Sequence, residues 1–210
     1  MLLQTEFVIT IARGFGSGGR TVGKMLAKKL DINYYDDELL KLASEESGIN
    51  IELFGKADEQ VKAGLFKRYN RSYGEKLISP DSTSFVSNDN LFNYQAKIIR
   101  DLAAKQNCII IGRCADHILK DNKKVIRLFF YADNESCVKT VMDMYAISEK
   151  EAKDRIESID RTRAAYYKYY TGKEWNDVNN YDLCINTGKL GFELSVDVVL
   201  GYMRQIGIEV

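Results

Sequence analysis

Short runs of hydrophobic residues alternate along the chain with longer segments whose hydrophobic residues recur every three or four positions. The short runs predict five β-strands, at residues 7–12, 32–35, 108–111, 125–131 and 183–185. The first, third and fourth runs are apolar at nearly every position. Such continuous runs are typical of strands that are buried on both faces of a parallel sheet.

The longer segments predict amphipathic helices, because their hydrophobic residues fall on one face at a helical repeat. This spacing runs through residues 22–30, 91–102, 137–145 and 192–203. Asp133 or Asn134 is the expected cap of the third of these helices. Ser148 and Glu151 have the spacing of a capping box, which predicts a further helix.

Strands that alternate with helices predict right-handed βαβ units and a three-layer α/β domain. The segment 48–90 breaks this alternation. It is polar, carries scattered aromatic residues and contains Pro80, the only proline of the chain. We expect it to form an inserted helical or loop region over the edge of the sheet.

Composition narrows the class of protein. A chain of 210 residues is long enough for one well-buried core, and its 30 basic and 30 acidic residues cancel, which argues against nucleic acid as the main partner. No apolar run approaches the ~20 residues of a membrane span, and the first residues lack the features of a signal peptide. The four cysteines are isolated in sequence and His117 is the single histidine. We therefore expect a reduced, cytoplasmic protein without a zinc site or a histidine relay.

The most informative segment is the glycine-rich loop that follows the first predicted strand and opens the first predicted helix. It reads Gly14-Phe15-Gly16-Ser17-Gly18-Gly19-Arg20-Thr21. This context and spacing are those of a phosphate-binding P-loop, GxxxxGK[ST]. The glycines let successive backbone N–H groups point at phosphate oxygens, and the helix N-terminus adds a partial positive charge. Thr21 supplies the hydroxyl expected on Mg²⁺.

One position departs from the motif, because Arg20 stands where the pattern has lysine. Arginine keeps the charge and can bind two phosphate oxygens, but it is bulkier than lysine. Lys24, one helical turn further on, is a second candidate for this cation. The segment also fits the GxGxxG pattern of dinucleotide-binding proteins, with Asp36 or Asp37 near the distance of the ribose contact, so that alternative stays open.

Polar residues at two other strand ends are candidates for the same site, because the carboxyl ends of parallel strands face the ligand crevice. After the second strand, Asp36 or Asp37 is expected to orient an acceptor hydroxyl or to hold Mg²⁺ through water, with Asp36 favoured, while the other caps the next helix. After the third strand, Arg113 suits a phosphate or carboxylate ligand, or else it forms a salt bridge with Asp116.

A later segment, 155–163, carries Arg155, Arg161 and Arg163. Charged helices usually face solvent, but phosphoryl transfer needs cations over the phosphates, and a closing lid is one way to supply them. Four tyrosines follow, and they predict either packing of this helix or a docking surface: Tyr166, Tyr167, Tyr169 and Tyr170.

Five stretches of the chain resemble the cytidylate kinase-like family of P-loop NTPases. They are residues 9–23 (ITIARGFGSGGRTVG), 34–39 (YYDDEL), 109–119 (IIIGRCADHIL), 160–164 (DRTRA) and 181–187 (YDLCINT). The resemblance implies a three-layer P-loop NTPase fold with a five-stranded parallel sheet, a helical insertion and an arginine-bearing lid. It also implies one P-loop kinase domain over 1–210, with an acceptor-side region at about 48–90 and the lid at about 148–172.

The resemblance also implies roles for particular residues. Asp160 and Arg163 would contact the acceptor nucleotide, and Arg161 would face the phosphates of ATP. The family has an acid directly after the arginine that follows the third strand, whereas here Cys114 stands there and Asp116 comes two residues later. We expect acceptor binding by Arg113, Asp116, Asp160 and Arg163. We expect catalytic roles for Arg20, Arg161 and Asp36.

The expected activity is ATP-dependent phosphoryl transfer to a nucleoside monophosphate. The resemblance favours CMP or dCMP as acceptor, with ATP and Mg²⁺ as cofactors and Thr21 beside the metal. Two alternatives stay open: a kinase that acts on another small-molecule acceptor, and a nucleotide-binding regulatory module with little turnover, which Arg20 would permit. The expected partners are small-molecule nucleotides, not nucleic acid or membrane, and the sequence leaves a homodimer open.

Overall fold

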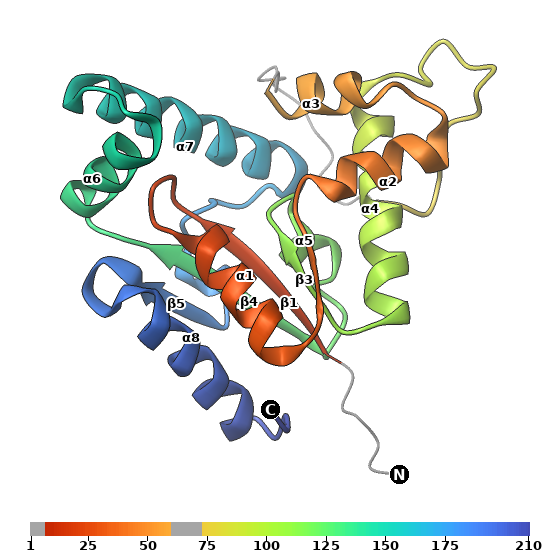
Figure 1. Ribbon diagram of the computed structural model, residues 1–210. Helices are drawn as coiled ribbons and strands as arrows, with labels where there is room; N and C mark the ends of the chain where they lie inside the picture. The colour runs from red at the N-terminus through yellow and green to blue at the C-terminus, as the bar shows by residue number, and fades with distance from the viewer. Residues whose placement is uncertain (1–6, 60–72) are drawn as a thin grey trace.

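The computed structural model describes residues 7–59 and 73–210, and a five-stranded sheet lies at its centre (Figure 1). All neighbouring strands are parallel, in the order β2-β3-β1-β4-β5. The strands are β1 Val8–Arg13, β2 Asn33–Tyr35, β3 Cys108–Ile111, β4 Val125–Tyr131 and β5 Leu183–Asn186. The five strands predicted from the sequence are confirmed, each within one residue of its expected ends.

Helices cover both faces of the sheet. Helices α1 and α8, the first and the last, pack on one face of the sheet. On the other face, the core is formed by residues of α2, α3, α4, α5 and α7. Helix α6 packs on α7. The helices are α1 Gly19–Leu30, α2 Glu38–Ser47, α3 Ile51–Glu59, α4 Asn88–Lys105, α5 Ala115–Ile118, α6 Asn134–Tyr145, α7 Glu149–Thr171 and α8 Thr187–Gln205, with a 3-10 turn at Val178–Asn180. This is the predicted three-layer arrangement.

Local sequence signals set the beginnings of two helices. The Asp133 side chain accepts a hydrogen bond from the Ser136 amide at the start of α6, so Asp133 rather than Asn134 is the cap. At the start of α7, Ser148 and Glu151 make both bonds of a capping box. Each bond satisfies an amide that has no partner inside its helix.

The central strand β1 divides the hydrophobic core. Ile9 and Ile11 belong to the cluster under α1 and α8, whereas Val8 belongs to the cluster on the opposite face. The parallel register places Ile9 beside Ile109 of β3 and Ile126 of β4. Both faces of β1 are therefore buried, which explains its unbroken apolar run.

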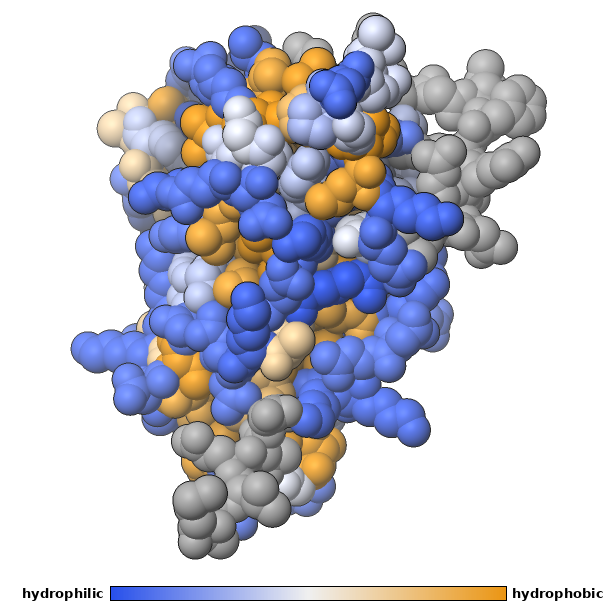
Figure 2. Space-filling model, turned by 90° about the vertical axis from the view of Figure 1, so that its right-hand side faces the viewer, coloured by the Kyte–Doolittle hydropathy of each residue, from blue (hydrophilic) through white to orange (hydrophobic). Residues whose placement is uncertain are grey.

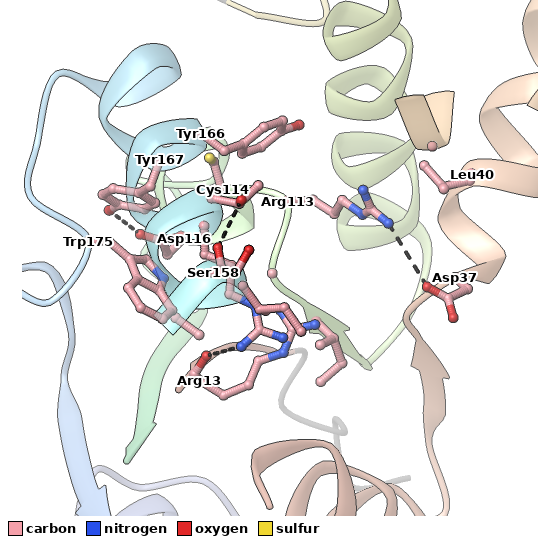
Figure 3. Close-up of a pocket in the computed structure, with 17 residues that line it drawn as sticks. Arg13, Asp37, Leu40, Arg113, Cys114, Asp116, Ser158, Tyr166, Tyr167 and Trp175 are labelled. Carbon is pink, nitrogen blue, oxygen red and sulfur yellow. Dashed lines mark hydrogen bonds and ion pairs between the residues drawn. The ribbon is translucent and has the colours of Figure 1, made fainter. Parts of the chain in front are cut away.

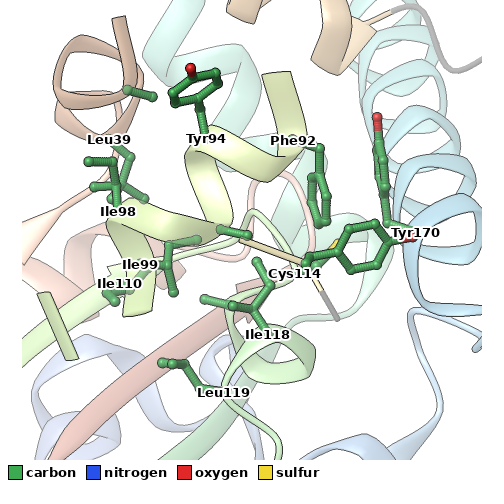
Figure 4. Close-up of a cluster of buried hydrophobic side chains, with 14 of the residues drawn as sticks. Leu39, Phe92, Tyr94, Ile98, Ile99, Ile110, Cys114, Ile118, Leu119 and Tyr170 are labelled. Atoms are coloured by element: carbon green, nitrogen blue, oxygen red, sulfur yellow. The ribbon is translucent and has the colours of Figure 1, made fainter. Parts of the chain in front are cut away.

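The core cluster on the face opposite α1 and α8, which contains Val8, packs α4 and α7 against the sheet (Figure 4). Phe92 of α4 stacks on Tyr170 of α7, with 3.8 Å between the ring centroids. Tyr166 and Tyr167 are also buried in this cluster, and Tyr169 packs against it. The tyrosines of α7 therefore pack the helix onto the core, and the alternative of a docking surface is wrong.

The segment 48–90 is described in part. It contains α3, an irregular stretch at 73–87 and the beginning of α4, which agrees with the expected helical or loop insertion. Residues 60–72 of this expectation lie outside the described residues. Phe54 of α3 and Tyr73 after the gap are both buried in the cluster that α2 and α4 share. Phe54 and Tyr73 thus anchor the segment in the core on this side of the sheet, whereas residues 74–89 are exposed or half-buried.

The strand order decides between the two readings of the glycine-rich loop. In this sheet β3 lies between β1 and β2. In the Rossmann dinucleotide fold the first two strands are neighbours, within the order 3-2-1-4-5-6. The observed order therefore removes the dinucleotide-binding alternative that the GxGxxG spacing had left open.

The face that carries α2, α3 and α4 is mainly hydrophilic, with hydrophobic side chains in small separate groups (Figure 2). Within residues 7–59 and 73–210, no helix combines the length and apolarity needed to cross a bilayer. In the same ranges no group of three or more histidine, cysteine or acidic residues is placed to hold a metal ion, and the four cysteines are free thiols.

The helix that follows the glycine-rich loop is anchored by Leu26, whose side chain is fully buried under the sheet. Leu26→Ala should lower the free energy of unfolding by about 2–5 kcal/mol, because it leaves a cavity in a close-packed core. Leu194→Ala on α8 is the matched control, since that leucine is 57% exposed and should change stability by less than about 0.5 kcal/mol. Urea denaturation measures both, and equal losses would contradict the core assignment.

Candidate functional site

The glycine-rich loop joins the end of β1 to the start of α1, and two glycines determine its shape. Gly16 and Gly18 have φ angles of 82° and 74°, a left-handed backbone that residues with a side chain rarely adopt. A Cβ on Gly18 would lie 2.2 Å from the ring of Phe192, and one on Gly16 would lie 2.7 Å from the carbonyl oxygen of Cys137. Glycine is therefore required at both positions by conformation and by space.

The loop is held at both ends and offers free amides in between. The Gly14 amide donates to the carbonyl of Phe130 at 3.0 Å, and the Thr187 hydroxyl donates to the carbonyl of Ser17 at 2.6 Å. Because α1 begins inside the loop, the amides of its first residues have no partner within the helix. Thr21, the third residue of α1, is exposed. The free amides suit a phosphate group, and the hydroxyl oxygen of Thr21 suits an associated cation.

The guanidinium of Arg20 pairs with Asp36. Its Nε lies 2.7 Å from Oδ2 and its Nη2 lies 3.1 Å from Oδ1 of this buried acid, while Asp37 lies 3.5 Å away. Asp37 precedes α2 but its side chain makes no capping hydrogen bond, so the capping role predicted for one of the two aspartates is wrong for both side chains. Lys24, the second candidate cation, lies over the ring of Tyr34 at 5.9 Å.

Arg13, the last residue of β1, is absent from the residues predicted from the sequence, yet it lies at the centre of the site. Its side chain is only 14% exposed, and its Nη2 lies 3.9 Å from Asp36 Oδ1. Burial, reinforced by the positive charge of Arg163, lowers the pKa of Arg13 to about 9. A sequence signal existed, because Arg13 stands at the carboxyl end of a buried strand just as Arg113 does.

A left-handed turn follows β3. Gly112, Arg113 and Cys114 have φ angles of 67°, 57° and 54°. Positive φ in two consecutive non-glycine residues is strained, and the surrounding structure must maintain it. The turn brings Arg113 Nη2 to 4.0 Å from Asp37 Oδ1. Backbone strain of this kind is frequent at functional sites, which supports a role for Arg113 beyond structure.

A cavity of about 640 Å³ opens between these elements (Figure 3). Figure 3 shows Arg113 and Asp37 on one side of it, and Tyr167 and Trp175 on the other. Its charged and aromatic lining consists of Arg13, Arg113, Arg163, Asp37, Asp116, Tyr166, Tyr167 and Trp175. Three guanidinium groups suit an anionic ligand, and the aromatic rings suit a planar or apolar portion of it.

Helix α7 passes over the carboxyl end of the sheet and contacts the glycine loop (Figure 1). The Asp160 carboxylate accepts hydrogen bonds of 2.9 and 3.1 Å from the Phe15 amide. Arg163 pairs with Asp160 at 3.0 Å and donates to the carbonyl of Arg13 at 3.1 Å. Burial raises the pKa of Asp160, and the charge of Arg163 opposes this rise. The Asp160–Arg163 pair on α7 therefore binds the backbone on both sides of Gly14, where β1 passes into the glycine loop.

Other arginines of α7 lie away from the cavity. The side chain of Arg161 is 72% exposed and pairs with Glu157. The guanidinium of Arg155 lies 3.8 Å from the centroid of the Tyr145 ring. Of the residues predicted for the acceptor side, the structure gathers three at the cavity: Arg113, Asp116 and Arg163.

Asp116 is buried in the wall of the cavity and accepts a hydrogen bond of 2.6 Å from the hydroxyl of Tyr167. Burial raises the pKa of Asp116, and the bond from Tyr167 opposes this rise. The neighbouring Tyr166 hydroxyl is also buried, but within the described chain it has no hydrogen-bond partner. Of the two adjacent tyrosine hydroxyls, that of Tyr167 therefore stabilises the Asp116 carboxylate, whereas that of Tyr166 makes no hydrogen bond within the described chain.

Comparison with known proteins identifies a family and several proteins whose sequences are similar to this chain. Residues 8–189 match the model of the cytidylate kinase-like family. The chain is similar to the cytidylate kinase of Methanopyrus kandleri, with 23% identity over 197 residues that cover 90% of this chain and 88% of the relative. It is similar to the cytidylate kinase of Methanothrix thermoacetophila, with 23% identity over 208 residues that cover 95% and 99%.

Solved structures share the fold. The crystal structure of an uncharacterized protein from Eubacterium ventriosum has a TM-score of 0.70 and 28% identity, and the match covers 94% of this chain and 98% of that one. The shikimate kinase of Bacteroides thetaiotaomicron has a TM-score of 0.54 and 15% identity, over 94% and 98% of the two chains. The second likeness shows the fold alone, which is that of P-loop kinases.

The hydrogen bond between Tyr167 and Asp116 predicts a pH-dependent stability effect. Burial raises the folded-state pKa of Asp116 above its unfolded value, so this acid lowers stability as pH rises above the ordinary aspartate range near 4. Tyr167→Phe removes the donor that opposes this rise. The variant should lose about 1–3 kcal/mol of unfolding free energy at pH 7, and the difference from wild type should narrow as pH falls below about 4.

Tyr166→Phe is the matched control, because its hydroxyl has no partner in the described chain and its removal should be neutral or slightly stabilising. Denaturant unfolding at several pH values measures both variants. A loss for Tyr167→Phe that does not vary with pH would contradict the linkage to Asp116.

Proposed function

The chain belongs to the cytidylate kinase-like family, and we propose that it transfers a phosphoryl group from ATP to a nucleoside monophosphate. CMP or dCMP is the favoured acceptor, because the named relatives are cytidylate kinases. The observation that carries the proposal is the position of the arginine-lined cavity, which opens beside the glycine loop at the carboxyl end of the sheet. Phosphates bound at these two places would meet between them, as transfer requires.

The residues of the glycine loop fit the phosphates of ATP. The left-handed glycines and the first amides of α1 provide backbone donors, and the helix N-terminus favours negative charge. Thr21 is the residue that would hold Mg²⁺, which when bound neutralises charge on the β- and γ-phosphates. Gly16, Gly18 and Gly19 would contribute through their amides. The amides of Gly14 and Ser17 donate to the carbonyls of Phe130 and Gly14, so these two residues would contribute by shaping the loop.

The cavity would hold the acceptor. Arg113 and Arg163 would bind its monophosphate, because a guanidinium group can donate to two phosphate oxygens at once. Asp160, which pairs with Arg163, would orient the acceptor from α7. Asp116, with Tyr167 behind it, would accept a hydrogen bond from a donor group of the acceptor. Asp36 would orient a hydroxyl group of the acceptor or hold Mg²⁺ through water.

In such a reaction an oxygen of the acceptor monophosphate attacks the γ-phosphorus, and the bond to the bridging oxygen of ADP breaks. The protein contributes alignment, exclusion of water and neutralisation of charge. We propose α7 as the lid, with Arg161 closing over the phosphates. Its pairing with Glu157 is at an exposed position, so breaking that pair would cost about 0–1 kcal/mol.

One observation favours a second candidate function, a nucleotide-binding regulatory module with little turnover. Arg20 occupies the lysine position of the motif, but its guanidinium is engaged by Asp36 and Asp37. A loop that binds nucleotide through its amides, while its cation is held elsewhere, would bind ATP without accelerating transfer.

The central experiment is an ADP-release assay with ATP, Mg²⁺ and a panel of acceptors. CMP or dCMP should give the highest kcat/KM, above UMP, AMP and a non-nucleotide hydroxyl acceptor. Turnover only with the hydroxyl acceptor would support a small-molecule kinase instead. Absence of turnover with all acceptors, while calorimetry detects ATP binding, would support the regulatory module. Absence of ATP binding would contradict both functions.

The acceptor role of Arg113 gives a sharper prediction. Arg113→Ala should lower kcat/KM by about 10-fold to 100-fold, mainly by raising KM for the acceptor, because one charged donor to the phosphate is lost. KM for ATP should stay within about twofold. Arg204→Ala is the control, since Arg204 is exposed on α8, and it should leave both constants unchanged. A larger effect on ATP than on the acceptor would show that Arg113 serves the donor.

A further inference from the structure

The side chain of Arg13 is held in a space that two glycines leave open. A Cβ on Gly112 would lie 2.4 Å from Arg13 Nη1, and a Cβ on Gly19 would lie 2.7 Å from Arg13 Cβ. Arg13 therefore passes between the first residue of α1 and the turn after β3. Any other residue at these two positions would displace it. The guanidinium is thus fixed at the junction of the glycine loop and the cavity, which it also lines.

This guanidinium is incompletely compensated. Its Nε is buried and makes no hydrogen bond to any described residue. Its nearest acid is Asp36, at 3.9 Å from Nη2, and that carboxylate already receives two shorter contacts from Arg20. Arg113 and Arg163 line the same cavity and add like charge. A buried cation in such surroundings is costly unless an anion joins it.

Arg20 differs in each of these respects. Its side chain is 52% exposed, and both its Nε and its Nη2 are committed to Asp36. Moving it onto a phosphate would leave the buried Asp36 carboxylate with the 3.4 Å hydrogen bond from the Tyr34 hydroxyl and the 3.9 Å contact to Arg13. Taking the guanidinium away from a buried carboxylate is unfavourable, so Arg20 is costly to recruit.

We propose that Arg13, and not Arg20, supplies the cation that binds the transferring phosphoryl group, and that Arg20 is a positioning residue that holds Asp36. The ligand that this cation fits is a pyrophosphate-containing anion, with one end on the glycine loop and the other facing the cavity. The part of the proposal that concerns transfer rests on the proposed function, whereas the anion-binding part is testable without turnover.

The first test measures stabilisation of the protein by inorganic pyrophosphate with Mg²⁺, from the shift of the melting temperature over a titration. Arg13→Met should melt at the same or a higher temperature than wild type without ligand, because it removes a buried like charge, and should bind pyrophosphate at least about tenfold more weakly. Arg20→Met should melt lower, because Asp36 loses its partner, yet keep its affinity within about threefold. Arg204→Met, at an exposed position of α8, should change neither.

The second test is single-turnover transfer with the best acceptor of the panel. Arg13→Met should lower the rate by about 10²–10³-fold, as loss of a preorganised charged donor does. Arg20→Met should act through Asp36, so it should raise the acceptor KM more than it lowers kcat, and Arg20→Lys should restore that KM. Arg13→Lys is a second variant that tests the proposal if the methionine variant does not fold. It keeps the charge but not the two-pronged geometry, and should bind pyrophosphate about tenfold more weakly, whereas Arg20→Lys should not.

The outcomes separate the two proposals. Loss of pyrophosphate affinity in the Arg13 variants alone, in a protein that turns over no acceptor, would support the assignment of Arg13 while contradicting the proposed transfer. Loss in the Arg20 variants alone, equal loss in both sets, or no response of wild type to pyrophosphate would overturn the assignment of Arg13.

Discussion

The site depends on the hydrogen-bonded ladder that β1 makes with its two neighbours. The ladder extends beyond the strands, because the Gly14 amide donates to Phe130 of β4 at 3.0 Å and the Gly112 amide donates to Ile11 of β1 at 2.9 Å. These bonds set the level at which the glycine loop and the left-handed turn leave the sheet. Arg13 lies between the two exits. A backbone interaction that takes no account of side-chain type therefore sets the spacing of the charged groups.

Around this hydrogen-bonded ladder, the acidic side chains each bind more than one donor. Asp36 serves both Arg20 and Arg13, and Asp160 serves both Arg163 and the amide of Phe15. At Arg13 this sharing leaves a buried guanidinium with one carboxylate contact, at 3.9 Å, and a buried Nε that has no hydrogen-bond partner among the described residues. This incomplete pairing of Arg13 is unfavourable for the ligand-free protein and favourable for an anionic ligand, which is the usual relation between stability and function at a binding site.

The backbone of the turn after β3 is also less favourable for stability and suited to ligand binding. Arg113 and Cys114, two non-glycine residues with left-handed φ that line the cavity, follow a strand that is completely buried. The strand, and α5 packed behind the turn, hold these residues in a conformation that they would not adopt alone. The hydrophobic core thus does more than stabilise the fold, because it maintains the strained turn that presents Arg113.

Much of the fold was determined by the sequence itself. Buried strands, amphipathic helices, the Ser148 capping box and the glycine loop depend on residues near one another in the chain, so hydrophobic period and spacing were enough to predict them. Membership of the cytidylate kinase-like family could also be suspected from short motifs, because those motifs are local. Arg13 could have been found too, since its place at a strand end is a local signal.

Only the tertiary structure decided how the charged side chains are paired. Arg20 bonds to an acid 16 residues away, Tyr167 reaches Asp116 across 51 residues, and Asp160 reaches Phe15 across 145. The motif predicted that Arg20 would face phosphate, and the helical repeat could not say which arginine of α7 would turn inward. Such contacts depend on how elements pack and on which rotamers burial permits, and neither is encoded in the spacing of residues along one segment.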